Sequence, residues 1–358
     1  YANMGQLNQN YNREMDTFPV TSSYSESKIN FSINTNTSSR ISNRDIINQA
    51  FKLHAQGQIQ KAFEKYQYLI NKGLNDHRVF SNYGIILKDF GKLKEAENFL
   101  LKAIELKPDF ANAYSNLGSI LINKGDRKEA ERLQRKAIKL NPDFAEAYSN
   151  LAGILKDNRE FKEAEKVILK AIELKPNYVV AHYNLGSILR SLGRLKDAEL
   201  STRKAIELKP DFAEAYSNLG SILQDSRKFK ESSDSFLKAI QFKPNYLLAH
   251  YNLGITLKHL GKLEQAKQSI NKAIELKYDF PEAHATLGAI LRDLGRIQES
   301  VLSYKNAIRL NPTYDKALLG MAKSMLIDGQ YIEGLKIIKD VDGFISFDLI
   351  KGLSFIEV

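Results

Sequence analysis

Seven asparagines recur at 34-residue intervals and are the clearest candidates for chemistry in this sequence. A carboxamide donates and accepts hydrogen bonds, so it can pair with both the N–H and the C=O groups of a polypeptide backbone. Asparagine is a poor helix former, so its recurrence within predicted helices needs a reason. In 34-residue frames counted from Asn43, the row occupies position 6: Asn48, Asn82, Asn116, Asn150, Asn184, Asn218 and Asn252.

Two explanations of this row remain open. Evenly spaced carboxamides would hold an extended peptide by its main chain, each hydrogen bond contributing about 0.5–1.5 kcal/mol net. Alternatively, the asparagines were copied by duplication or bond the neighbouring repeat. Positions 9, 12 and 13 have diverged between frames whereas position 6 has not, which favours peptide contact. We therefore predict six peptide-binding residues, Asn82, Asn116, Asn150, Asn184, Asn218 and Asn252.

Cations and tyrosines are predicted on the same helix face. The cations at position 12 are suited to pairing with acidic side chains of a ligand. Tyrosines at position 5 are suited to stacking on a ligand or hydrogen-bonding to it. The alternative is that each Lys–Asp step is solvated surface and each tyrosine is merely exposed. The residues concerned are Lys88, Lys156, Arg190 and Lys258, with Tyr183 and Tyr251.

Residues that carry catalysis or hold metals form no matching pattern. The chain has no cysteine, which excludes thiolate metal sites, a cysteine nucleophile and disulfides. No histidine pair has the i, i+4 spacing with glutamate that binds zinc, and His182, His250 and His284 take position 4, where an aromatic packs. Glutamates lie on regular surface faces and not in converging pairs. We predict no catalytic residue, metal or cofactor, and hence no enzyme within this chain.

The elements that position these residues follow from the repeat. Frames begin at residues 43, 77, 111, 145, 179, 213, 247, 281 and 315. Positions 4, 7, 8 and 11 share one helix face by the i, i+3, i+4, i+7 rule, and positions 2, 5, 6, 9, 12 and 13 lie opposite. Small residues at positions 8, 20 and 27 let two helices approach, glycine at position 15 suits a left-handed turn, and proline near position 32 ends the second helix.

This pattern resembles the tetratricopeptide repeat from residue 43 to about 341. The resemblance implies an all-α fold, a right-handed superhelical solenoid of antiparallel helix pairs whose first helices line a concave groove. Eight frames are regular. The ninth has Met321–Ala322 in place of Leu-Gly, as in a terminal cap. The asparagine row is similar to the ladder in the repeat superhelix of O-linked N-acetylglucosamine transferases, which implies a peptide clamp.

Three segments are predicted. Residues 1–42 form a polar tail, disordered or conditionally ordered, in which only Lys28–Thr37 alternates like a short strand. Residues 43–348 form the repeat array. Residues 349–358 end a hairpin-like cap around Lys351–Gly352 or begin a further domain.

The net charge of +10 belongs to the array, because residues 1–42 sum to zero. It favours an acidic partner, or it is a solvated lysine-rich outer face. Lysines without interleaved exposed aromatics disfavour nucleic acid. No apolar run approaches the roughly 20 residues of a membrane span, and no signal peptide is evident. The lack of cysteine fits a reducing compartment, so we predict a cytoplasmic location.

Three functions compete. The leading prediction is a protein–protein interaction scaffold that binds an extended peptide or protein segment in its groove. The second is the substrate-recruiting arm of a larger enzyme, a glycosyltransferase or oxygenase, whose catalytic domain lies beyond Val358. The third is a scaffold that self-associates through its terminal repeats.

Overall fold

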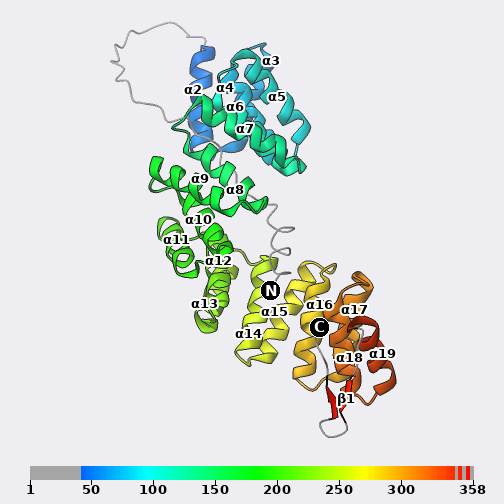
Figure 1. Cartoon of the computed structure of the whole chain (residues 1–358). Coiled ribbons are helices and arrows are strands. Elements are labelled where there is room, and N and C mark those ends of the chain that lie inside the picture. The colour runs from blue at the N-terminus through cyan, green and yellow to red at the C-terminus, as the bar shows by residue number, and fades with distance from the viewer. Residues whose placement is uncertain (1–41, 343–345, 349–351, 355–358) are drawn as a thin grey trace. The chain divides into compact units, whose positions relative to one another are not determined.

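Eighteen α-helices make up most of the computed structural model, which describes residues 42–342, 346–348 and 352–354 (Figure 1). Each frame supplies a first helix, here called A, and a second helix, B. The nine A helices begin at residues 43, 77, 111, 145, 179, 213, 247, 281 and 315, so every predicted frame start is confirmed. The all-α prediction is confirmed as well.

The chain divides into two compact units between Ile188 and Leu189, inside α10 (Val179–Ser191). Within each unit, A helices pack against the B helices that follow, and B helices against the next A helices. Unit 1 contains α2 (Asn43–Ala55), α3 (Ile59–Asn71), α4 (His77–Asp89), α5 (Leu93–Leu106), α6 (Ala111–Lys124), α7 (Arg127–Leu140), α8 (Ala145–Asp157) and α9 (Phe161–Leu174). Unit 2 contains α11 (Leu195–Leu208), α12 (Ala213–Asp225), α13 (Phe229–Phe242), α14 (Leu247–His259), α15 (Leu263–Leu276), α16 (Pro281–Asp293), α17 (Ile297–Leu310), α18 (Asp315–Ile327) and α19 (Tyr331–Asp342).

The turn from A to B is left-handed at position 15 in every frame. Seven frames have glycine there, with φ between 71° at Gly57 and 86° at Gly125. The other two frames have arginine, Arg159 at φ 66° and Arg227 at φ 59°. A side chain with a Cβ is strained in this region, so the flanking helices impose the turn even where the residue type opposes it.

Close contact between A and B helices depends on the missing side chain at position 8. A Cβ on Gly254 would lie 2.5 Å from the Ile270 side chain, and one on Gly220 would lie 2.8 Å from Phe236. Ile270 and Phe236 both occupy position 24 and are fully buried. The predicted role of a small residue at position 8 is therefore confirmed.

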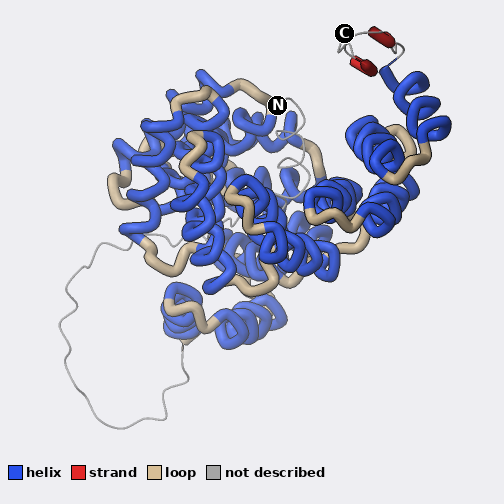
Figure 2. Tube along the Cα trace, turned by 90° about the horizontal axis from the view of Figure 1, so that it is seen from below, coloured by secondary structure: helices blue, strands red, loops and turns tan. Residues whose placement is uncertain are grey.

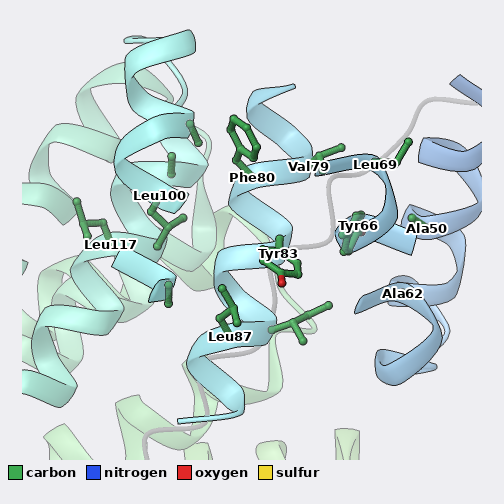
Figure 3. Close-up of a cluster of buried hydrophobic side chains, with 14 of the residues drawn as sticks. Ala50, Ala62, Tyr66, Leu69, Val79, Phe80, Tyr83, Leu87, Leu100 and Leu117 are labelled. Carbon is green, nitrogen blue, oxygen red and sulfur yellow. The ribbon is translucent and has the colours of Figure 1, made fainter. Parts of the chain in front are cut away.

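The core of unit 1 joins successive pairs. Figure 3 shows Tyr83 and Leu87 of α4 between the side chains of α2 and α3 on one side and Leu100 and Leu117 on the other. Tyr66 is fully buried within this cluster. This cluster therefore joins α2, α4 and α6 through the B helices between them, and a second cluster joins α6, α7 and α8.

The ends of the chain bear on two predictions. The polar tail lies outside the described residues except for Ser42, which caps α2 by accepting from the backbone N–H of Asp45. After α19, β1 (Ser346–Asp348) pairs antiparallel with β2 (Gly352–Ser354), the strands shown red in Figure 2. Gly352 pairs with Asp348 and begins β2, and residues 349–351, which include Lys351 of the predicted turn, lie outside the described part.

Candidate functional site

Three asparagines of unit 1, Asn116, Asn150 and Asn184, are tied to the preceding repeat. We call the side of the A helices with positions 2, 5, 6, 9, 12 and 13 the inner face. On it each carboxamide donates from Nδ2 to a serine hydroxyl at position 5 of the repeat before. The three bonds are Asn116 to Ser81 at 3.1 Å, Asn150 to Ser115 at 3.3 Å and Asn184 to Ser149 at 3.2 Å. The same tie therefore recurs at three successive junctions.

The serines are the functional residues that sequence reasoning missed. Ser81, Ser115 and Ser149 are 2%, 0% and 1% exposed, so their hydroxyls are fixed inside the stack. Each one directly precedes an asparagine in the sequence, and this Ser-Asn pair was the available signal. The expectation that the asparagines bond the neighbouring repeat is thus correct for these three.

The carbonyl oxygens of these carboxamides stay available. Among the described residues, Oδ1 of Asn116, Asn150 and Asn184 accepts no hydrogen bond. In the same residues the one buried side-chain polar atom without a partner is Nε2 of His54, so none of these three oxygens is fully buried, although Asn116 as a whole is only 6% exposed. Each hydrogen bond to a serine therefore uses an N–H of the carboxamide and leaves its Oδ1 as an acceptor in a fixed position.

The remaining asparagines of the row have different settings. Asn82 is half-buried and lies beside the hydroxyl of Tyr66, whose pKa is raised by burial. Asn218 donates to Oγ1 of Thr202 at 3.2 Å, and Thr202 and Tyr66 both occupy position 24. Asn252 is half-buried. The row is therefore not uniform, and its regular part lies in unit 1.

Cations at position 12 pair with carboxylates at position 13. For Arg190 and Lys258 the partner belongs to the next repeat: Arg190 Nε lies 2.6 Å from Asp225 Oδ2, and Lys258 Nζ lies 2.9 Å from Asp293 Oδ2. In unit 1 Lys156 Nζ lies 3.7 Å from the carboxylate of Asp157. An acidic ligand would have to displace a carboxylate already present, which weakens selection for acidic peptides on this face.

Two of the predicted contact residues, Lys88 and Tyr251, are largely buried. The side chain of Lys88 is 5% exposed and lies 3.5 Å from Asp89, whose pKa is raised by desolvation. Tyr251 is 9% exposed because Phe280 covers it, with ring centroids 4.7 Å apart. Burial raises the pKa of the Tyr251 hydroxyl to about 12. Tyr183 is half-buried.

The histidines at position 4 bind backbone. Nε2 of His182 and of His250 each lies 2.8 Å from a carbonyl oxygen, that of Pro176 and Pro244 respectively. His284 makes the same contact with Tyr278 at 3.0 Å. Each imidazole thus ties an A helix to the loop that precedes it.

The described residues contain neither a cluster of metal-ligating side chains nor a membrane-spanning helix. No three or more His, Cys, Asp or Glu side chains gather there as metal ligands would. None of the helices in this part of the chain has the length and apolar character to cross a bilayer.

Comparisons with known proteins match this architecture. Models described as tetratricopeptide repeat match residues 77–110, 111–144, 145–178, 179–212, 213–246, 235–268 and 281–314. The crystal structure of the APC/C hetero-tetramer Cut9–Hcn1 aligns at TM-score 0.66 and 15% identity over 78% of this chain and 55% of that one. The chain therefore spans only about half of that protein.

A second structure, Pseudomonas aeruginosa PilF, aligns at TM-score 0.50 and 20% identity over 55% of this chain and 90% of that one. At these identities both likenesses concern the fold. No curated protein sequence matches the chain.

Proposed function

Since the chain belongs to the tetratricopeptide-repeat family, we propose that it is a protein-interaction scaffold whose inner face binds an extended segment of another polypeptide. The observation that carries the proposal is the tied asparagine. Asn116, Asn150 and Asn184 each hold a carbonyl oxygen that accepts no hydrogen bond from the described residues, at the same place in successive repeats.

The ties make these acceptors effective. A free asparagine would lose rotamer entropy on binding, whereas a carboxamide already held by a buried serine has little to lose. Oδ1 can then accept a main-chain N–H of the ligand, a group present in every residue except proline. Recognition of this kind depends on ligand conformation more than on ligand sequence.

The spacing of these asparagines indicates which ligand conformation they can bind. Neighbouring A helices such as α4, α6 and α8 contact each other directly, which sets their axes about 8–10 Å apart. A polyproline II strand presents the same side every third residue, after about 9.3 Å. An extended ligand in that conformation would present one backbone N–H to each asparagine in turn.

The test measures binding of a peptide selected from a random display library against the whole chain. Replacing Asn116, Asn150 and Asn184 together by alanine removes three bonds of about 1 kcal/mol each, so affinity should fall about 100-fold in fluorescence anisotropy. The matched control changes three asparagines of the B helices, Asn98, Asn271 and Asn306, and should bind like the wild type.

N-methylation of the peptide separates main-chain recognition from other modes. Methylating every third backbone nitrogen in the correct phase should weaken binding as strongly as the triple substitution. If the folded triple variant binds the peptide as the wild type does, the asparagines serve only to join repeats. A substrate-recruiting arm of a larger enzyme would use the same face, so the result applies to that alternative too.

A further inference from the structure

Helix α7 differs in charge from every other B helix in the described part of the chain. It contains six basic residues and two acidic ones, a net charge of +4, whereas the others lie between −1 and +1. Its exposed cations follow one side at i, i+4, i+7, i+8 and i+11: Lys128, Arg132, Arg135, Lys136 and Lys139. We call these five residues the α7 stripe.

In other B helices a glutamate at position 29 neutralises the lysine at position 26, but α7 lacks this glutamate. Position 26 is lysine in α9 and α11, and a glutamate at position 29 binds it, Glu173 to Lys170 and Glu207 to Lys204, each at 2.6 Å. In α7 position 29 is Lys139 itself. Among the described residues Lys128 and Lys139 make no ion pair, and the ammonium of Lys136 lies over the Tyr114 ring at 6.0 Å.

The arginines of the stripe are already held in place. Arg132 forms a bidentate pair with Glu129 at 2.6 and 2.7 Å. Arg135 bonds Glu131 at 2.8 Å and, in the next repeat, Glu163 at 2.7 Å. These pairs orient the guanidinium groups but leave the net charge of the helix strongly positive, so the stripe attracts a further anion.

The surroundings of the stripe limit the shape of a partner. Leu101 on α5 and Leu169 on α9 are each 48% exposed, and both occupy position 25, as Arg135 does on α7 between them. The same neighbouring helices expose Glu105 and Glu173. The basic surface is therefore about 16 Å long, the rise from Lys128 to Lys139, and only one helix wide.

We propose that the α7 stripe is a second docking surface, which takes an acidic amphipathic helix of a partner protein. Carboxylates at i, i+4, i+7 and i+11 of such a helix match the stripe, and its apolar flank meets the two leucines. An anionic bilayer would contact Glu105 and Glu173 as well as the stripe, and these two carboxylates would repel it. Single-stranded nucleic acid would need exposed rings for stacking, and the stripe has none.

The experiment uses the whole chain and a fluorescent alanine-based helical peptide with glutamate at i, i+4, i+7 and i+11 and leucines on one flank. Replacing Lys128, Lys136 and Lys139 by glutamine should weaken binding about tenfold at low ionic strength, since exposed pairs are individually weak. The control variant K196Q/K204Q/K230Q removes the same charge from α11 and α13 and should leave binding unchanged.

Three results would overturn the proposal. One is equal weakening by both variants, which would indicate net charge alone. Another is equal binding of a peptide with glutamine in place of glutamate. The third is stripe-dependent binding of equimolar phosphatidylserine–phosphatidylcholine vesicles, or of oligouridine, stronger than that of the acidic peptide. The asparagine variants leave α7 intact, so failure on one face is distinct from failure on the other.

Discussion

The bond between Ser81 and Asn116 joins two repeats and should be measurable as a coupling energy. Both residues are buried, 2% and 6% exposed, and their atoms are 3.1 Å apart. Changing Ser81 to alanine removes the acceptor and leaves the Asn116 amide with a lost bond. Changing Asn116 to alanine removes the donor. The double variant removes both and leaves nothing unpaired between them.

The magnitude follows from burial. Removing one partner of a buried hydrogen bond costs about 1–3 kcal/mol, and alanine returns about 0.5 kcal/mol as a better helix former. Each single variant should therefore lose about 1–2 kcal/mol of unfolding free energy. The double variant should lose about 1 kcal/mol less than the sum of the two singles.

Hydrogen exchange of α4 and α6 amides is the suitable assay, since repeat arrays open locally. The pair Ser115 and Asn150 is a matched comparison, because its donor is shared between Ser115 at 3.3 Å and Ser119 at 3.4 Å. Its coupling should be smaller, about 0.5 kcal/mol. Additive losses for Ser81 and Asn116, within about 0.3 kcal/mol, would refute the idea that this bond joins the repeats.

Two other predictions concern turns and pH. Glycine in place of Arg227, at φ 59°, should raise the unfolding free energy by about 0.5–1 kcal/mol in urea denaturation, and R159G should do the same; a loss in both would mean the arginine side chains stabilise their turns. Burial lowers the pKa of His54 below its ordinary 6.5, so the unfolded chain binds this proton more readily. The contribution of His54 to the unfolding free energy is therefore fully present above about pH 6.5, where the imidazole is neutral in both states. It is lost as the pH falls through the folded-state pKa. Denaturation between pH 5 and 7 should therefore show a smaller slope for H54Q, and an unchanged slope would exclude His54 as a contributor.

The repeat period was enough to predict every helix pair, because local chemistry agrees with the fold at each step. Glycine at position 15 and small residues at position 8 act within a single frame, where sequence spacing equals spatial neighbourhood. Arg159 and Arg227 break the local rule, yet the turn persists, since packed helices on both sides determine it.

The inner face was predicted less well, since its contacts cross from one repeat to the next. A helical period shows which residues share a face but not that Arg190 meets Asp225, or Asn184 meets Ser149, 35 residues away. Burial of Tyr251 depends on Phe280, which precedes the following A helix. Such pairings follow from the stacking geometry and have no signature in a single frame.

The ties between asparagine and serine also have a mechanical meaning. Each links one repeat only to the next, so under tension along unit 1 the junctions would carry the load in series. The junction with the longest bonds, between Ser115 and Asn150, should then separate first, and the chain should lengthen in steps of one repeat. A partner bound to the asparagines of several repeats would share that load and strengthen the junctions between them.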